Sequence, residues 1–229
     1  MKKLVLLAAV ASFFAAQAAM AGTVVLTFDQ LGNEEAVDNY YAGGFGGNGT
    51  GPGPNYGITF SSNSLAITSV DAGGSGNFND NPSGNNIVFF LSGAADTMNV
   101  AGGFTTGFSF YYSAVVYPGY INVWSGLNDT GTLLASLDLG VTPEGGGTCN
   151  TAYCPWVPIG VSFDGTAQSV DFGGSANYIG FDNITLGAST PGGAAPEPAS
   201  LMLFGSGLVG LASRIRRRRN RTAQPAVQA

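Results

Sequence analysis

The side chains that could do acid–base, nucleophilic or metal-binding chemistry in this 229-residue sequence are fourteen acids and two cysteines. Histidine is absent. Without His, Ser-His and Cys-His nucleophiles and His-based zinc sites are excluded. All basic residues lie at the two ends: Lys2, Lys3, Arg214, Arg216, Arg217, Arg218, Arg219 and Arg221. The intervening chain therefore has no Schiff-base lysine and no phosphate clamp, and nucleic acid is not expected as a partner. Three possibilities remain for the central chain: catalysis by carboxylates, binding of a hard cation, or no chemical role.

The two cysteines, Cys149 and Cys154, enclose a four-residue segment. A zinc site would need two further thiolate or imidazole ligands, and the sequence offers none. In an oxidising compartment such a pair forms a local disulfide. We therefore predict a Cys149–Cys154 disulfide, worth about 2 kcal/mol in the chain-entropy model, that fixes a loop next to Trp156.

The first 21 residues have the layout of a secretory signal peptide. Two lysines precede an apolar run over residues 4–16, and a small-x-small sequence ends at Ala21. This arrangement predicts export through the Sec translocon and cleavage after Ala21. The alternative is an uncleaved membrane anchor, but a spanning helix needs about 20 apolar residues and this run is shorter.

The C-terminal end combines a Pro-Glu-Pro triplet, an apolar run and an arginine cluster: Pro196, Glu197, Pro198, then residues 199–212, then Arg214, Arg216, Arg217, Arg218 and Arg219. A helix over 199–212 would rise about 21 Å, against about 30 Å of hydrocarbon, so it is a short transmembrane helix. The positive-inside rule keeps the arginines cytoplasmic and places the preceding chain outside the inner membrane. A permanent anchor is the alternative to a removable one.

The segment from Ala195 to Arg219 resembles the PEP-CTERM sorting signal of Gram-negative bacteria that make extracellular polysaccharide. The triplet, the Gly-punctuated apolar run and the arginine cluster occur in the order and spacing of that signal. The resemblance implies recognition by an exosortase, a membrane-embedded enzyme that resembles cysteine transpeptidases. It also implies cleavage near Pro196–Pro198, loss of the helix, and export to the cell surface or the surrounding matrix.

Removing both ends leaves residues 22–186 as one predicted domain, followed by a linker at 187–195, the sorting signal at 196–221 and a polar tail at 222–229. Many short strands with frequent turn signals favour an all-β fold. We predict an antiparallel β-sandwich, with a jelly roll as the preferred topology, flanked by the signal-peptide helix and the C-terminal hydrophobic helix. The predicted strands are Thr23–Phe28, Gly57–Ser61, Leu65–Val70, Asn86–Leu91, Thr97–Val100, Phe104–Ser113, Tyr120–Ser125, Thr132–Leu139, Val157–Phe163, Gln168–Phe172 and Tyr178–Leu186.

The apolar alternation of the last predicted strand slips by one residue at Asp182-Asn183, which predicts a β-bulge. This strand resembles the closing strand of jelly-roll carbohydrate-binding modules. In such modules an acid near the first strand and one on the last often share a structural calcium ion, and the resemblance maps these acids to Asp29 and Asp182. Two interpretations stay open: a calcium site, or two acids that accept hydrogen bonds from backbone amides.

Two further regions are aromatic. The uncharged, Gly-rich segment Tyr40–Tyr56 predicts a flexible loop, with a sugar-stacking surface as the alternative. Four other aromatic residues are predicted to lie in the core or at its rim: Trp124, Trp156, Tyr117 and Tyr120.

Three functions are compatible with this sequence. The first is a non-enzymatic exported protein of the cell surface or the polysaccharide matrix of a biofilm. The second is a carbohydrate-binding module that binds extracellular polysaccharide, with or without structural calcium. The third is a glycoside hydrolase that uses two carboxylates, for example Glu34 or Glu35 with an Asp. No feature of the sequence nominates such a pair, so enzymatic activity is not expected.

Overall fold

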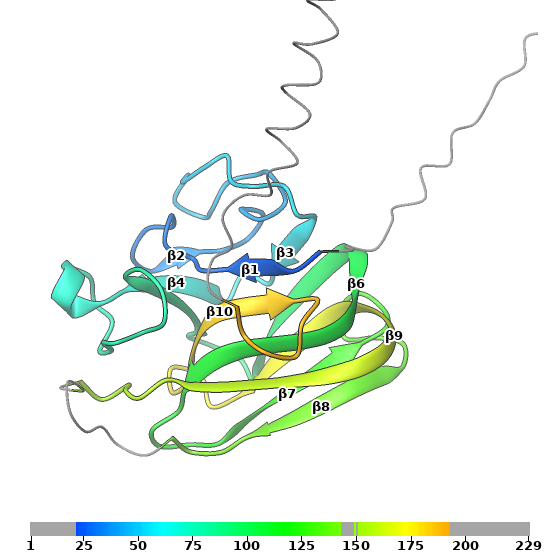
Figure 1. The fold of residues 1–229 in the computed structure, drawn as a ribbon. Helices are drawn as coiled ribbons and strands as arrows, with labels where there is room; N and C mark the ends of the chain where they lie inside the picture. The colour runs from blue at the N-terminus through cyan, green and yellow to red at the C-terminus, as the bar shows by residue number, and fades with distance from the viewer. Residues whose placement is uncertain (1–21, 143–148, 150, 193–229) are drawn as a thin grey trace, which may run out of the picture. The chain divides into compact units, whose positions relative to one another are not determined.

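The computed structural model describes residues 22–142, 149 and 151–192 of the chain. Strands and one 3-10 turn (η1, Val70–Ala72) are the elements of this part (Figure 1). The strands are β1 (Val24–Leu26), β2 (Glu35–Ala36), β3 (Ile58–Phe60), β4 (Ser64–Thr68), β5 (Asn86–Phe90), β6 (Ala95–Ser113), β7 (Gly119–Trp124), β8 (Leu133–Leu139), β9 (Val157–Gly174) and β10 (Gly180–Leu186).

No helix among the described residues has the length and hydropathy that crossing a bilayer requires. The two helices predicted from the sequence, in the signal peptide and over residues 199–212, lie outside the described residues.

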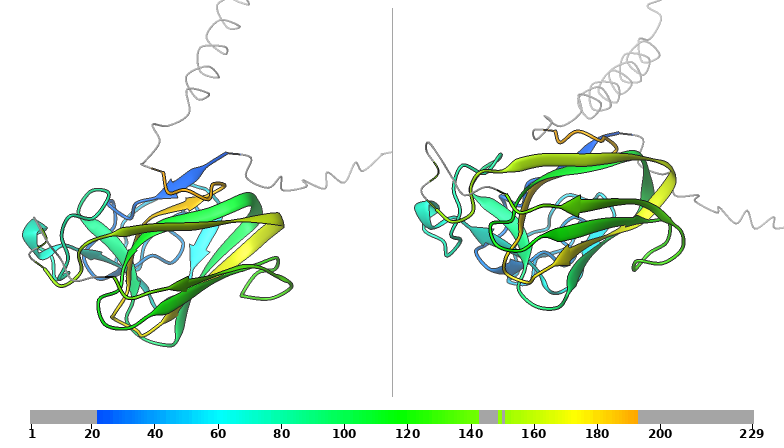
Figure 2. Two further views of the ribbon diagram at one scale, coloured as in Figure 1. Left: turned by 60° about the horizontal axis from the view of Figure 1, so that its bottom comes forward. Right: turned by 90° about the horizontal axis from the view of Figure 1, so that it is seen from below.

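All strand pairs are antiparallel, and the long strands β6 and β9 take part in two layers (Figures 1 and 2). In one layer, the first part of β6 pairs with β3 and with the last part of β9, which continues to β7 and β8. In the other, the second part of β6 pairs with β10, which continues to β1 on one side and to β5, β4 and β2. The sheet therefore folds over itself, and the predicted all-β antiparallel sandwich is confirmed.

Phenylalanine rings fill the space between the two layers. Phe172 on β9 contacts Phe181 on β10 with ring centroids 5.1 Å apart, and it contacts Phe110 on β6 at 6.2 Å, both edge to face. All three side chains are buried. The period-two alternation of the strands directs these large rings to one side, and their burial is the main apolar contribution to the fold.

The predicted strands agree with the structure except at three places. The predicted strands Thr97–Val100 and Phe104–Ser113 form the single strand β6, and Val157–Phe163 and Gln168–Phe172 form the single strand β9. Glycines suggested a turn in each, but the ladder between β6 and β9 continues past them with shifts of register. The two-residue strand β2 was not predicted, because so short a strand leaves no alternation to detect.

The Gly-rich segment 40–56 forms a hydrogen-bonded lobe on the body rather than the predicted flexible loop. Tyr40 and Tyr41 are buried in the core, and the Tyr41 hydroxyl accepts a hydrogen bond from the backbone N–H of Phe28 at 2.9 Å. Backbone hydrogen bonds close the lobe, including Gly46 N to Thr50 O and Tyr56 N to Tyr41 O. The tyrosines thus anchor a segment whose composition alone suggested disorder.

Candidate functional site

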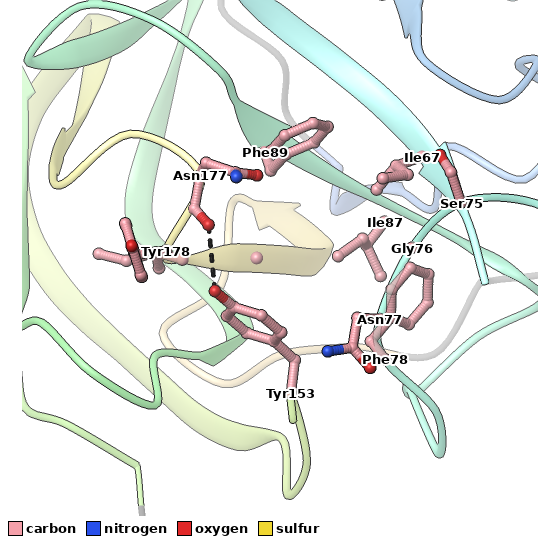
Figure 3. A pocket seen from close by; sticks show the side chains of 12 residues that line it. Ile67, Ser75, Gly76, Asn77, Phe78, Ile87, Phe89, Tyr153, Asn177 and Tyr178 are labelled. Carbon is pink, nitrogen blue, oxygen red and sulfur yellow. Dashed lines mark hydrogen bonds between the residues drawn. The ribbon is translucent and has the colours of Figure 1, made fainter. Parts of the chain in front are cut away.

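A groove of about 320 Å³ lies where β4, β5 and the start of β10 meet three loop segments (Figure 3). We call it the Tyr153–Tyr178 groove, after the two tyrosines that border it. Its walls combine apolar rings and side chains with amides, among them Asn77, Phe78, Ile87, Phe89, Asn177 and Gly180. Its volume lies at the lower end of the range for small-molecule sites, about 300–1,000 Å³.

The floor of the groove comes from β5 and β10. Alternation along β5 places Ile87 and Phe89 on the same side of the sheet. Across from them stands Gly180, the first residue of β10, where an added Cβ would lie 2.6 Å from Cδ1 of Ile87. At Gly180 the backbone of β10 lies so close to Ile87 of β5 that a residue with a Cβ would not fit without movement.

One wall depends on the disulfide. Cys149 and Cys154 are bonded, as predicted, with their Cα atoms 5.5 Å apart. Tyr153, next to the second cysteine, donates its N–H to Asn77 O at 3.2 Å and its hydroxyl to Asn177 O at 3.0 Å (Figure 3). Trp156 supports this loop by donating its indole N–H to Asn79 O at 3.0 Å. The disulfide loop therefore holds Tyr153 between the two asparagines.

The rim of the groove presents aromatic rings to solvent. Tyr178 is 38% exposed and Tyr117 is 45% exposed, and their ring centroids lie 4.8 Å apart, edge to face. Tyr117 was predicted to lie in the core or at its rim, and it stands beside the groove. Because Asn177 adopts a positive φ of 65°, the turn before β10 directs Tyr178 to this rim.

The lining is uncharged. Among the described residues that line the groove, none is acidic or basic. Burial, and next the proximity of Tyr178, raise the pKa of the Tyr153 hydroxyl, so it remains a protonated donor. In the part of the chain that the structure describes, the side-chain amides of Asn77 and Asn177 make no hydrogen bond with the protein. The groove can therefore offer amide donors, amide acceptors and aromatic faces to a neutral ligand.

Asp29 and Asp182, the predicted calcium ligands, both hold the loop of residues 81–86. Asp29 Oδ1 accepts hydrogen bonds from the backbone N–H groups of Asn85 at 3.0 Å and Asn86 at 3.3 Å. The Asp182 carboxylate accepts from Asn81 Nδ2 and Ser83 N at 3.1 Å each, and from Asn183 N at 2.6 Å. The Ser83 hydroxyl also donates to Asp182 Oδ1, at 3.1 Å. Most of the donors are N–H groups, which cannot coordinate a cation, so these contacts fit the interpretation of the two acids as caps of backbone amides. A shared calcium ion stays a prediction.

The predicted bulge at Asp182-Asn183 is confirmed. The register between β10 and β6 shifts between Asp182 and Thr185, and Asn183 has a φ of 49°. Burial raises the pKa of Asp182 to about 7, even though its hydrogen-bond donors favour the charged form. The bulge thus aims a buried carboxylate at the loop of residues 81–86.

Asp80, Cys149 and Cys154 form the one group of three or more potential metal ligands within the described residues. Its two sulfur atoms are joined in the disulfide, so they supply no thiolate. This group therefore does not suit a metal ion.

The carboxylate of Glu35, considered above as a hydrolase residue, is buried and bonded to the Gly-rich lobe. It accepts hydrogen bonds from Gly32 N at 2.6 Å, from Asn48 N at 3.0 Å, and from both the N–H and the hydroxyl of Thr50 at 3.0 and 2.7 Å. Burial by itself raises the pKa of Glu35, but these donors outweigh it and hold the pKa below its usual value. Its neighbour Glu34 is exposed and accepts from Ser75 Oγ.

Sequence reasoning did not nominate Tyr153, Tyr178 or the two asparagines as site residues. They come from three separate parts of the chain, and only the fold brings them together. Two local signals could have drawn attention to them: Tyr153 lies inside the disulfide loop, and Asn177-Tyr178 directly precedes the last strand, where a turn is required.

Comparison with known proteins identifies the C-terminal segment. The family model of the PEP-CTERM protein-sorting motif matches residues 194–218. The chain thus carries this motif, which marks an exported protein that an exosortase-type enzyme sorts. No curated protein matches the chain. The motif lies outside the described residues, as do the arginines of its cluster.

Some solved structures are similar to part of this chain. A family 6 carbohydrate-binding module is 20% identical over 57% of this chain and 87% of its own, with a TM-score of 0.36. The K1 cleaved adhesin domain of Lys-gingipain from Porphyromonas gingivalis W83 is 14% identical over 73% and 99%, with a TM-score of 0.39. TmCBM61, solved in complex with β-1,4-galactotriose, is 12% identical over 69% and 96%, with a TM-score of 0.35. At these scores the similarity supports no transfer of a ligand.

Proposed function

We propose that this protein is a non-enzymatic component of the bacterial surface or extracellular matrix, and that its body binds neutral polysaccharide through the Tyr153–Tyr178 groove. One observation carries the proposal: the groove combines exposed tyrosine rings with two free asparagine amides and has no charged residue in its lining. Sugars present both apolar ring faces and hydroxyl groups, and such a site supplies a partner for each.

The charge of the chain favours a neutral ligand over an anionic one. All basic residues lie in the signal peptide and around the sorting motif, so the body has none with which to bind a uronate, sulfate or phosphate group. Its acids give the body a negative charge, which repels anionic polymers. Neutral stretches of polysaccharide meet no such repulsion. The lack of carboxylates in the groove supports binding rather than glycoside hydrolysis, which requires two of them.

The disulfide supports a place outside the cytoplasm. It fixes the loop that carries Tyr153, and disulfides persist in oxidising compartments such as the periplasm. The sorting motif likewise indicates transport out of the cytoplasm. We propose the cell surface or surrounding matrix of a Gram-negative bacterium as the final location.

Replacing Tyr178 with Ala tests the proposed binding. We expect the mature protein to be retarded in native gels that contain neutral polysaccharides, and Tyr178→Ala to weaken the affinity on the order of tenfold, about 1.4 kcal/mol. Asn77→Ala, which removes a groove amide but keeps the carbonyl that accepts from Tyr153, should weaken it about fivefold. Tyr120→Ala is the matched control, because Tyr120 is 37% exposed on β7 and does not line the groove.

Two results would contradict the proposal. One is that no neutral polysaccharide retards the protein, or that anionic polymers retard it more strongly. The other is that Tyr178→Ala and Tyr120→Ala change the affinity equally, since that would place binding somewhere other than the groove.

A further inference from the structure

The chain leaves the body through residues 187–192, which are bonded to the body; we call this segment the strap. Sequence composition predicted it as part of a linker. Four hydrogen bonds hold it: Gly187 N to Gly107 O at 3.0 Å, Thr106 Oγ1 to Gly187 O at 2.8 Å, Ser109 Oγ to Ala188 O at 2.9 Å, and Gly192 N to Thr185 Oγ1 at 3.1 Å. These bonds hold the segment on the body at both of its ends.

Two glycines of the body make room for the strap. A Cβ on Gly107 of β6 would lie 2.7 Å from the nitrogen of Ser189, and one on Gly160 of β9 would lie 2.2 Å from its oxygen. No side chain can occupy either position unless the strap moves. Figure 2 shows this segment, in orange after β10, running beside blue β1; Gly192 lies against Val25 of that strand. The body therefore has a slot shaped for the strap.

Thr106 gives a second, independent sign that the slot is specific. It is a β-branched residue with a φ of 75°, a conformation that such residues rarely adopt. This strained backbone sits at a register shift of β6 and places the Thr106 hydroxyl between two carbonyl acceptors, that of Gly187 in the strap and that of Thr105. Strain of this kind persists where a surrounding contact requires it.

The strap ends directly before the sorting motif, which the family model places at 194–218. Only three residues separate Gly192 from Pro196, and the four Cα–Cα steps between them reach about 14 Å at most in extended chain. Release of the strap would add its own six residues, or about 20 Å more. The length of free chain before the cleavage region thus depends on whether the strap is docked.

We propose that the strap controls processing: docked, it limits the free chain between the body and the sorting motif to the few residues after Gly192 and so hinders the membrane-embedded enzyme, and release of the strap gives the enzyme access. Cleavage breaks one peptide bond near Pro196–Pro198. Its carbonyl carbon passes to an acceptor, water or a primary amine, and the freed amino group stays on the arginine-rich peptide. The proposal rests on exosortase-type sorting and is independent of polysaccharide binding.

Processing rates in cells test this. The full-length chain is expressed with its sorting enzyme, and loss of the C-terminal peptide is followed by pulse-chase. Gly107→Ala, which displaces the strap, should raise the cleavage rate by at least about fivefold, because loss of even one of the four hydrogen bonds typically gives a change of that size. A Gly/Ser insertion of the strap's length between Gly192 and Gly193 should raise it equally with the strap still docked. Gly140→Ala is the control, because an added Cβ there meets nothing within 4 Å.

Hydrogen exchange separates docking from processing. The amides of Gly187 and Gly192 should be protected in the unaltered protein and in the insertion variant, and exposed in Gly107→Ala, while core amides stay protected in all three. An insertion that leaves the cleavage rate unchanged or lowers it overturns the proposal, whether or not Gly107→Ala folds. Unprotected strap amides in the unaltered protein would overturn it as well.

Discussion

Glu35→Ala is expected to destabilise the protein by about 3 kcal/mol, because it removes the buried carboxylate that accepts hydrogen bonds from the N–H groups of Gly32, Asn48 and Thr50. A hydrogen bond to a charged group contributes about 1.5–3 kcal/mol, and these three donors are only partly buried, so water replaces part of the loss. Among the described residues, Glu35 is the only side chain that accepts hydrogen bonds from both Asn48 and Thr50, which belong to the Gly-rich lobe. We therefore expect the lobe to detach from the body before the rest of the protein unfolds. The measurement is the free energy of unfolding from urea denaturation.

The adjacent Glu34→Ala is the matched control, since Glu34 is exposed and should cost less than about 0.5 kcal/mol. Glu35→Gln keeps the shape and one acceptor oxygen and should fall between the two. Equal effects of Glu35→Ala and Glu34→Ala would contradict the anchoring role. So would a stable Glu35→Ala variant that has lost a glycoside hydrolase activity.

Asp96→Asn is expected to stabilise the protein at pH 7 by about 2 kcal/mol, or about 5 °C in Tm. Burial first, and then the charge of Asp129, raise the pKa of the Asp96 carboxyl from 3.8 to about 6, although hydroxyls of Ser64 and Ser61 donate to it. The folded state thus holds a charge that it disfavours at pH 7. An asparagine is neutral, and its side-chain oxygen can still accept from the two hydroxyls, which both donate to Oδ1 of Asp96.

The sign of the pH dependence follows from the raised pKa. Between about pH 4 and pH 6 the folded state binds more protons at Asp96 than the unfolded state does, so stability should fall as pH rises through this window, by about 3 kcal/mol in total. Urea unfolding at intervals from pH 4 to pH 8 measures it, as the difference between the unaltered protein and Asp96→Asn. The exposed Asp138→Asn is the control. If the difference in free energy of unfolding between the unaltered protein and Asp96→Asn does not vary with pH, the pKa of Asp96 is not raised in the folded state.

Much of the fold could be predicted because period-two alternation is a local signal. Val170 and Phe172, or Phe108 and Phe110, alternate with polar or small residues, and each pair lies buried on a strand as expected. Continuity of strands was harder to predict. Glycines interrupt the pattern in β6 and β9, and only pairing with a partner strand reveals that the ladder passes through them.

The candidate site was largely beyond sequence reasoning. The disulfide followed from counting ligands and from the predicted compartment, but its role in holding Tyr153 at a groove depends on contacts with residues far away in the chain. The tyrosines at 40 and 41 show the reverse case. Their Gly-rich surroundings suggested a loose segment, and tertiary burial of the two rings overrides that local composition.

Export followed by cleavage at the sorting motif is the central claim, and mass spectrometry of the C-terminus tests it most directly. Protein is recovered from the outside of cells that have the sorting enzyme and from cells that lack it. We predict a chain that ends near Pro196–Pro198 in the first case and one that still carries the arginine cluster in the second. An intact C-terminus in both strains, or full-length protein folded in the cytosol, would contradict the claim.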